Sequence, residues 1–408
     1  MTSQGNRSPS PFTARRRVVL LDGASESGSL SDHLADIRSQ FDARDFETVV
    51  IDLKRQGSDV ELIAAIQSGL VRFCCGLSGF GAELSVTHAN GSSNFWDFAR
   101  TPYVGLMPDS PVFMPARHRL SSPFILFLYT DPVHLEIGAA IGSSATARAL
   151  IGQSGFPPLS APVPIDARDI AILYAKAGGD AEEIRTSWRA HAPGRGPFIE
   201  EVIDACCWTA DVSIWHVARE IARARPGSPD VASEAFCYSV CQCELYVRRA
   251  RASRALQELL RFPVHVAGGD WTHLDWTRAK AKLEVRVPLT ELRALFGRSK
   301  IVLNAMPALR FSTHHRVVEG MLHGAAAASD SNSWLDTAAT RDRYVAFDWS
   351  PGAVAHAIDN ALANDAALGE LAERGRAFAV ANHDRDAHFN HMLKTIDAHL
   401  DRATQSGG

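Results

Sequence analysis

Short apolar runs alternate with longer stretches of helical periodicity along the first 150 residues. Runs rich in β-branched residues and leucine predict strands at residues 18–21, 48–53, 71–75, 103–107 and 124–129. Apolar residues at helical spacing predict helices between the first of these strands, at about 30–41 and 59–69. Strands that alternate with helices of ten or more residues are typical of βαβ units in a parallel sheet. We therefore expect an N-terminal Rossmann-like domain.

The pattern changes after residue 165, where long helical stretches follow one another and no strand is expected. Strand patterns return at residues 262–268, 300–304, 324–329 and 344–347, again with helical stretches between them. The expected fold class is therefore α/β, with two Rossmann-like domains and a helical connecting region. The expected boundaries are a disordered leader at 1–16, an N-terminal domain at 17–165, a helical connecting region at 166–260, a C-terminal domain at 261–380, and a C-terminal helix at 381–402 that packs back on the N-terminal domain.

Composition narrows the class of function. The chain has 408 residues, of which 46% are hydrophobic, so two domains can each bury a core. Its 42 Lys and Arg against 46 Asp and Glu give no electrostatic reason to bind nucleic acid or an anionic membrane. No apolar run approaches the roughly 20 residues needed to cross a bilayer. Small-molecule chemistry is favoured.

The seven cysteines also bear on location and on metal binding. An odd number of cysteines in a chain without an export signal favours reduced thiols and a cytoplasmic location. Cys237, Cys241 and Cys243 lie within seven residues, but they form no C-x-x-C pair. Buried thiols are therefore favoured over a metal site.

Three titratable residues follow strands of the N-terminal domain. Asp109 and His118 come after the strand at 103–107, and Asp131 comes after the strand at 124–129. In open α/β sheets, ligands bind beyond the carboxyl ends of the strands. A carboxylate or imidazole placed there can act as the general base that deprotonates an acceptor hydroxyl. Ordinary turn chemistry explains the same aspartates, so both interpretations stay open.

The most specific segment is 297–331, which reads as a strand, a loop with two histidines, a helix, and a second strand ending at Asp330. Arg316 and Glu319 lie three residues apart near the start of that helix and share a face. An arginine at a helix N-terminus suits a diphosphate, and a carboxylate one turn further in can accept the hydroxyls of a ribose. A solvated Arg–Glu pair would have the same spacing.

This order of elements closely resembles the C-terminal domain of GT-B glycosyltransferases, and most of all the bacterial spore-maturation CgeB-like group. The residues that carry the resemblance are a strand ending in K-I-x-L-N, a short loop, R-x-x-E-x-x-x-x-G-A, and a strand ending in Asp. The segment VHVAGGDW at 264–271 resembles that family's strand and turn, and residues 382–385 resemble its late His/Arg element. The resemblance covers about residues 255–390. It implies a GT-B fold, in which the two domains face a cleft.

The resemblance also implies roles for individual residues. The C-terminal domain would bind a nucleotide sugar, and the N-terminal domain would hold the acceptor. Glu319 would bind the ribose, and Arg316 would neutralise the diphosphate. The other donor-side residues that the resemblance implies are Gly268, Gly269, Asp270, Lys300, Arg310, His314 and His315.

One position departs from the family pattern. Retaining GT-B enzymes often carry a second glutamate eight positions before the ribose-binding one, and Phe311 stands there in this chain. The retaining mechanism is therefore left open, with His314 or His315 filling the space. GT-B enzymes generally need no catalytic metal, because basic side chains and a helix dipole stabilise the leaving diphosphate. We expect no metal and no cofactor beyond the nucleotide-sugar co-substrate.

The expected function is that of a hexosyl- or related glycosyltransferase. It would move a sugar from a nucleoside-diphosphate donor to a hydroxyl or other nucleophile of a glycan, protein or lipid-linked acceptor. Two alternatives stay open. Because the first glutamate is missing at Phe311, the chain could be an inactive GT-B-like subunit that binds a nucleotide sugar or a partner. A GT-B-fold epimerase acting on the nucleotide sugar itself is the third hypothesis.

Overall fold

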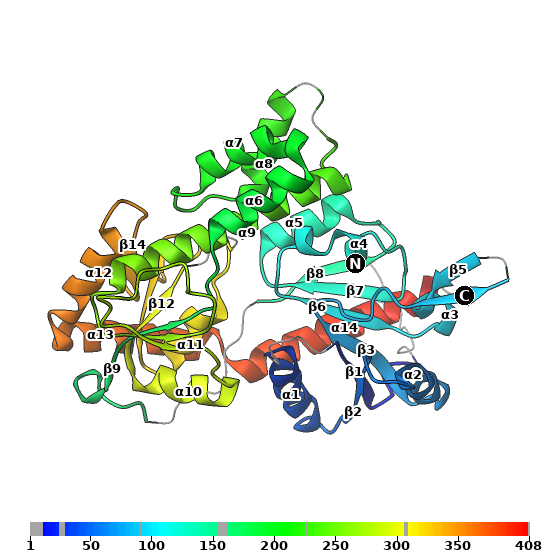
Figure 1. The fold of residues 1–408 in the computed structure, drawn as a ribbon. Coiled ribbons are helices and arrows are strands. Elements are labelled where there is room, and N and C mark those ends of the chain that lie inside the picture. Colours follow the sequence, from blue (N-terminus) through cyan, green and yellow to red (C-terminus); the bar gives the residue numbers. More distant parts are fainter. Residues whose placement is uncertain are drawn as a thin grey trace, which may run out of the picture. The chain divides into compact units, whose positions relative to one another are not determined.

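The chain folds into two compact units, each with its own sheet and its own core. The structure, a computed structural model, describes residues 11–23, 29–89, 91–152, 161–225, 227, 229–305 and 309–406. Each unit has a six-stranded sheet in which all neighbouring strands are parallel (Figure 1). These two parallel α/β sheets confirm the expected fold class.

Unit 1 holds the described residues up to Thr130, His134–Ile151, and the chain from Phe389 onwards. Its strand order is β2-β1-β3-β6-β7-β8. Alternate side chains of β1 enter the cores on opposite faces of the sheet, because side chains alternate along a strand. The strands are β1 (Arg17–Asp22), β2 (Glu47–Asp52), β3 (Val71–Leu77), β6 (Tyr103–Met107), β7 (Ile125–Tyr129) and β8 (Ala147–Leu150). The helices are α1 (Ser29–Asp42), α2 (Ser58–Gln67), α3 (Phe95–Ala99), η1 (Pro111–Phe113), α4 (Pro115–His118) and α5 (Pro132–Ile141), and a separate hairpin is formed by β4 (Ser85–His88) and β5 (Gly91–Asn94).

The last helix of the chain, α14 (Arg385–Ser406), belongs largely to unit 1. Phe389, Met392, Ile396 and Leu400 recur at helical spacing and are all buried. They pack in the same core as side chains of β1, β3, β6 and β7. Figure 1 shows this red helix lying along the blue and cyan strands. One face of the unit 1 sheet is therefore covered by the end of the chain.

The segment before β1 corrects the expected leader at 1–16. Residues 1–10 lie outside the described residues, but Phe12 is only 8% exposed and packs in the unit 1 core. The guanidinium of Arg15 donates to the carbonyl of Val71 at 3.0 Å, and Arg72 donates to the carbonyl of Thr13. The segment is mostly polar, but its single phenylalanine, Phe12, is buried in the core. The ordered chain therefore begins before residue 17.

Unit 2 holds Asp131–Val133 and the described residues from Gly152 to His388. Its strand order is β11-β10-β9-β12-β13-β14. The strands are β9 (Ile170–Ala175), β10 (Val264–Ala267), β11 (Lys282–Glu284), β12 (Ser299–Asn304), β13 (Ala326–Asp330) and β14 (Val345–Phe347). The helices are η2 (Ile165–Ala167), α6 (Ala181–His191), η3 (Pro193–Arg195), α7 (Gly196–Cys206), α8 (Ile214–Ala224), α9 (Glu234–Leu259), α10 (Leu289–Arg298), α11 (His315–Leu322), α12 (Ala353–Leu362) and α13 (Asp365–Asn382).

Strand β9 corrects the expectation that the connecting region at 166–260 is entirely helical. It lies between β10 and β12 in the unit 2 sheet and is buried along most of its length. A central parallel strand is covered on both faces, so it reads as a continuous apolar run that periodicity cannot tell from a buried helix. The sequence also missed β8 and β11, which are short edge strands, and the β4–β5 hairpin.

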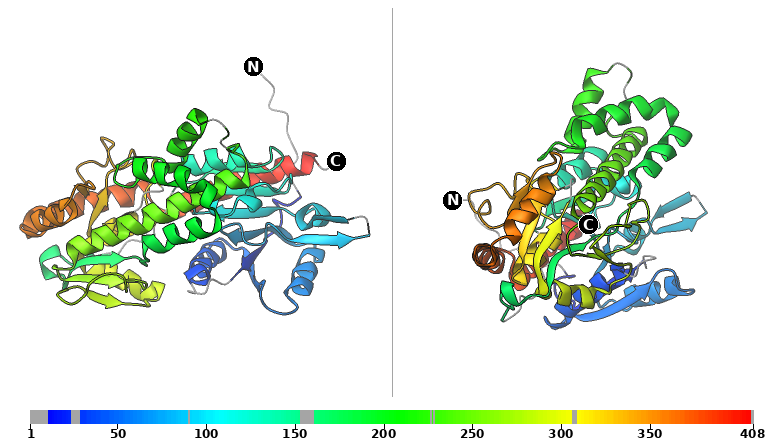
Figure 2. Two further views of the ribbon diagram at one scale, coloured as in Figure 1. Left: turned by 45° about the horizontal axis from the view of Figure 1, so that its top comes forward. Right: turned by 60° about the vertical axis from the view of Figure 1, so that its left-hand side comes forward.

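Helix α9 links the helical region of unit 2 to its sheet (Figure 2). Ala252, Ala255, Leu256 and Leu259 in its C-terminal half pack in the core that contains β9, β10, β12 and β13. Its N-terminal half packs against α6, α7 and α8. Arg251, between the two halves, is 2% exposed and is therefore positioned by both sets of neighbours.

The seven cysteines are thiols and form no disulfides, and six of them are buried. Burial raises the pKa of Cys206 to about 12 and that of Cys241 to about 12, so both stay protonated at neutral pH. The described residues contain no group of three or more His, Cys, Asp or Glu that could hold a metal ion. Among those same residues, no helix is both long and apolar enough to span a membrane.

Candidate functional site

Four neighbouring strands of unit 2 end at one edge of its sheet. In the order β10-β9-β12-β13 these strands are parallel, so their carboxyl ends lie side by side. Lys176 follows β9, Gly268 follows β10, Asn304 ends β12 and Asp330 ends β13. In open α/β sheets this edge carries the ligand site. We call these residues, together with Gly269, His314 and Arg316, the carboxyl edge of unit 2.

The two glycines of the carboxyl edge let two loops approach each other. Gly268 has a φ of +142°, and a Cβ on it would lie 2.4 Å from the carbonyl oxygen of Lys176. The carbonyl of Gly269 accepts a 2.8 Å hydrogen bond from the amide of Gly178. Asp270, which follows, is exposed and has a φ of 65°. The glycines thus allow the loop after β9 and the turn after β10 to pack directly against each other.

The N-terminus of α11 holds an arginine at the same edge. His314 is the N-cap, and its Nδ1 accepts from the backbone N–H of Arg316 at 3.2 Å. The Arg316 side chain donates to the side-chain oxygen of Asn304 at 2.9 Å, and Asn304 in turn donates to Ser329 at 2.9 Å. Arg316 is 7% exposed, so this chain of contacts fixes its guanidinium. His315 is partly buried, with its ring centroid 4.1 Å from that of His314.

Lys176, Arg248 and Arg316 form what we call the cation cluster. Burial lowers the pKa of Lys176 well below its ordinary value, and the charges of Arg316 and Arg248 lower it further, against an opposing effect of Asp330. Burial also lowers the pKa of Arg316 to about 10, with Arg248 contributing. For His314, burial and then Arg316 hold the pKa well below the usual range, so its imidazole is neutral.

Among the described residues, no hydrogen bond or ion pair involves the amine of Lys176, whose side chain is partly buried. Desolvated cations that repel one another are costly unless an anion joins them. The cation cluster therefore has the electrostatics of an anion site, with a helix N-terminus beside it.

Asp330, the carboxylate of the carboxyl edge, already has a cationic partner. It forms a buried 2.9 Å ion pair with Arg251 and accepts from the indole N–H of Trp349 at 3.1 Å. Arg251 also donates to the carbonyls of Cys206 and Cys207, at 2.9 and 2.8 Å. The pair fixes α9 to the end of β13, and it occupies the carboxylate of Asp330 with a cation outside the cation cluster.

Glu319 lies one turn into α11 and is 1% exposed. Its carboxylate is 3.7 Å from the Nδ1 of His323, whose ring also contacts the carbonyl of Glu319 at 2.9 Å. Burial lowers the pKa of His323, so the imidazole is neutral at pH 7. Gly324, which follows, ends the helix with a φ of +74° and packs on Pro162. Its conformation is explained by this helix end, without a ligand.

Two residues of the implied donor set lie apart from the cation cluster. Lys300 is near the start of β12, at the opposite, amino end of the sheet, where its amine pairs with Asp365 at 2.7 Å. The side chain of Arg310 pairs with Asp211 at 3.4 Å and lies over the ring of Phe311. Phe311 itself is 44% exposed. The structure thus brings together His314, His315 and Arg316 but places Lys300 elsewhere.

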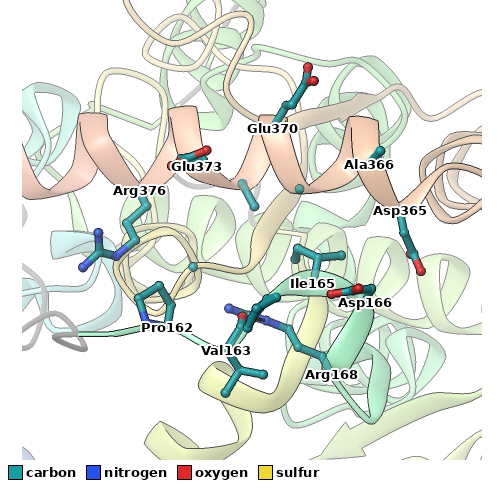
Figure 3. A pocket seen from close by; sticks show the side chains of 14 residues that line it. Pro162, Val163, Ile165, Asp166, Arg168, Asp365, Ala366, Glu370, Glu373 and Arg376 are labelled. Carbon is teal, nitrogen blue, oxygen red and sulfur yellow. Dashed lines mark hydrogen bonds between the residues drawn. The ribbon is translucent and has the colours of Figure 1, made fainter.

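A cavity of about 540 Å³ lies at this amino end, between α13 and the segment 162–168 (Figure 3). Its acidic side chains are those of Asp166, Asp365, Glu370 and Glu373. The guanidinium of Arg168 is held by carbonyl groups, among them that of Ser299 at 2.7 Å. Four carboxylates disfavour a diphosphate, so the carboxyl edge fits the donor better.

The three candidate bases have different surroundings. Asp109 follows β6 and is partly buried. His118 is fully buried, with its Nδ1 2.7 Å from the hydroxyl of Tyr129, and burial lowers its pKa to about 3. It is a neutral core residue, which explains it without a catalytic role. Asp131 is also fully buried and accepts from Ser312 at 2.9 Å and from the backbone N–H of Phe311 at 3.1 Å. Asp109 is therefore the least enclosed of the three.

The sequence did not single out Lys176 or Arg248. Lys176 was missed because β9 was assigned to a helical region, although the segment I-L-Y-A-K-A-G-G has the same strand-then-glycine form as V-H-V-A-G-G. Arg248 carries no local signal, since only the packing of α9 brings it close to Lys176 and Arg316. The parallel between the two strand ends is the signal that could have found the lysine.

Known proteins resemble this chain in sequence and in fold. Residues 248–394 match a family described as glycosyl transferase-like. No curated protein sequence matches the chain. Sucrose-phosphate synthase from Thermosynechococcus elongatus superposes with a TM-score of 0.55 at 11% identity, over 93% of this chain and 98% of that one.

Two glucosyltransferases are also similar in structure. A DNA-modifying β-glucosyltransferase, solved with and without uridine diphosphoglucose, has a TM-score of 0.52 at 9% identity, over 94% of this chain and 99% of that one. An α-glucosyltransferase in complex with UDP-glucose and DNA has a TM-score of 0.50 at 8% identity, over 93% and 99%. The chain therefore has the expected GT-B fold of two Rossmann-like domains. With the glycosyl transferase-like match, the fold supports a glycosyltransferase enzyme.

Proposed function

We propose that the protein transfers a sugar from a nucleoside-diphosphate donor bound at the carboxyl edge of unit 2. The observation that carries this proposal is the cation cluster at the N-terminus of α11. A diphosphate there would interact with Lys176, Arg248 and Arg316 and relieve their mutual repulsion. The helix dipole of α11 adds to the attraction. The proposed site is within the segment that matches a glycosyl transferase-like family, apart from Lys176.

We propose positions for the donor's other parts from the family resemblance. The turn at Gly268 and Gly269 would border the sugar or the nucleoside, because glycines let a ligand approach the backbone closely. Glu319, one turn into α11, would accept the ribose hydroxyls. Uridine diphosphate is the first probe to use, since two structurally similar glucosyltransferases were solved with UDP-glucose or uridine diphosphoglucose. We further propose membership of the CgeB-like group, on the sequence motifs alone.

The leaving diphosphate would be stabilised by fixed cations, without a metal. When the bond from the sugar to the diphosphate breaks, negative charge grows on the β-phosphate oxygen. Lys176 and Arg316 would stabilise that charge, and the guanidinium of Arg316 is already held by Asn304 before the donor binds. Asp109 is the proposed base for an acceptor nucleophile, because it follows a unit 1 strand and is less enclosed than His118 or Asp131.

A second candidate is a subunit that binds a nucleotide sugar and does not transfer it. The observation in its favour is Phe311, which is 44% exposed at the position where retaining relatives carry a glutamate. Donor binding of ordinary affinity, with no transfer and no hydrolysis, would favour this candidate.

The proposed function is tested first by donor binding. Thermal-shift titration with UDP and a panel of nucleotide sugars should raise the melting temperature, because these ligands bind the folded state alone. Arg316→Ala should abolish the shift. Arg298→Ala is the matched control, since this arginine pairs with Asp169 on the surface of α10 and should leave the shift unchanged. No shift with any donor, or an equal shift in the Arg316 variant, would contradict the proposal.

A further inference from the structure

A second cavity lies on unit 2, on the face of α9 that points away from the cation cluster. Its volume is about 610 Å³, which is within the usual range for a small-ligand site. Ala250, Ser253 and Gln257 of α9 line it, at the i, i+3, i+7 spacing of a single helix face. Arg248 points about 180° away from that face, because successive residues turn by about 100°. The cavity is therefore separate from the proposed donor site.

An exposed indole is the main apolar surface of this cavity. Trp208 is 45% exposed, whereas five other tryptophans in the described chain are almost fully buried. The guanidinium carbon of Arg254 lies 4.5 Å from the centre of its ring, and the ring of Trp349 is 6.2 Å away. These contacts hold the indole in place while leaving much of it open to solvent. A fixed, half-exposed tryptophan combines a large apolar face with a polar edge, which suits ligand binding.

Hydrogen bonds fix the polar side chains around the indole. The hydroxyl of Tyr246 donates to Glu182 at 3.0 Å, and Ser253 contacts the ring of His273 at 2.7 Å. The carboxylate of Glu258 accepts from the backbone N–H groups at the start of α12, at 3.0 and 3.2 Å. Carboxylates have more acceptor sites than these bonds use. The cavity thus presents fixed acceptors beside an aromatic face.

The charge of the lining narrows the class of ligand. Asp180, Glu182 and Glu258 line the cavity, where Glu182 pairs with Arg185 at 2.6 Å and Glu258 pairs with Arg254 at 3.5 Å. The one lining guanidinium already has a carboxylate partner, so a phosphate or another anion is disfavoured. A neutral ligand with many hydroxyls matches both features. Its hydroxyls can donate to the carboxylates, and the C–H face of a sugar ring can lie against the indole, whose π face is negative.

We propose that this cavity is a saccharide-binding site, in which a ring of a neutral oligosaccharide stacks on Trp208 and donates hydrogen bonds to Glu182 and Glu258. The site binds a glycan chain at a distance from the donor diphosphate. The claim is one of binding alone, so it does not rest on the proposed transfer reaction. A glycan held here would be a natural acceptor or product if transfer occurs.

The test is isothermal titration calorimetry of the full chain with neutral trisaccharides, namely maltotriose, cellotriose, chitotriose, mannotriose and xylotriose. At least one should bind, and Trp208→Ala should weaken that binding about tenfold or more, as expected when a stacking aromatic is removed. Phe98→Ala is the matched control, because this side chain is a 66% exposed aromatic in unit 1. Circular dichroism would verify that both variants fold.

Two further measurements separate this proposal from the proposed function. Gln257→Ala, on the same helix face, should also weaken saccharide binding, and it gives a second test if the Trp208 variant does not fold. Arg316→Ala should leave saccharide binding intact although it abolishes the response to UDP. Binding to none of the trisaccharides, equal binding by wild type and Trp208→Ala, or tighter binding of an acidic trisaccharide such as trigalacturonic acid would overturn the proposal.

Discussion

Lys176 is the residue whose replacement most directly tests the cation cluster. We predict that Lys176→Met weakens UDP binding and at the same time raises the melting temperature. Both effects have one cause, because the amine is desolvated close to Arg316 and Arg248 and has no hydrogen-bond partner in the described chain. Methionine keeps the length of the side chain and removes its charge.

The expected loss of binding follows from the contact that is removed. A hydrogen bond between a charged amine and a phosphate contributes about 1.5–3 kcal/mol. Each 1.4 kcal/mol corresponds to a factor of ten in affinity, so the Kd for UDP should rise about 10- to 150-fold. Inorganic pyrophosphate should lose a similar factor, because the lost contact is to the diphosphate.

The stability effect has the opposite sign and depends on pH. In the folded protein, burial and the two arginines lower the pKa of Lys176, whereas the unfolded chain has the ordinary lysine value. At a pH below the folded-state pKa, the unfolded chain holds this proton more tightly, so the charge destabilises the fold. Above the unfolded pKa the penalty vanishes. The variant should therefore melt higher than wild type at neutral pH, and the difference should shrink as the pH rises toward the ordinary lysine value.

Calorimetric titration with UDP and differential scanning fluorimetry between pH 6 and pH 10 measure the two effects. Lys300→Met is the matched control, since this lysine has a carboxylate partner, Asp365, at 2.7 Å. It should melt slightly lower than wild type and bind UDP normally. The reasoning is refuted if Lys176→Met binds UDP as tightly as wild type, or if it melts at a lower temperature.

Three further predictions concern the residues around the cluster. Arg251→Met leaves Asp330 as a buried carboxylate without its ion-pair partner and should lower the free energy of unfolding by about 3–5 kcal/mol in urea titrations; a loss below about 1 kcal/mol would contradict this. Gly268→Ala would place a Cβ 2.4 Å from a backbone carbonyl and should reduce both stability and UDP affinity, while Gly269→Ala, with its nearest contact 3.2 Å away on a side chain, should have a milder effect. Glu319→Gln should weaken UDP binding about tenfold but leave pyrophosphate binding unchanged, and equal losses for both ligands would exclude a ribose contact.

Much of the fold could be predicted from local patterns, since nine of the strands coincide with apolar runs. Strand β9 was missed although glycines follow it as they follow β10, because a short apolar run has no periodicity that distinguishes a strand from a buried helical segment. The error had a consequence for the site. Once residues 170–175 were taken as helix, Lys176 was no longer the residue after a strand, and its position at the carboxyl edge was missed.

For the site, position along a strand was more informative than residue type. Arg316 and His314 lie at the carboxyl edge, as expected from a helix that follows β12. Lys300 was assigned to the same site by the family resemblance. It stands at the beginning of β12, however, and a strand begins at the edge opposite to the one where it ends. Arg248 depends on tertiary packing alone, and no pattern in one sequence contains that information.

The placement of α14 affects the order in which the two units can fold during synthesis. The core of unit 1 includes Phe389, Met392, Ile396 and Leu400, which emerge from the ribosome long after β1 to β8. Until then, one face of the N-terminal sheet has an uncovered apolar strip, because α1 alone does not supply these side chains. Unit 2 has all of its strands before residue 350 and does not need that helix for its sheet. Unit 1 is therefore synthesised first but completes its folding last. A fragment ending at Ile151, which lacks α14, should aggregate.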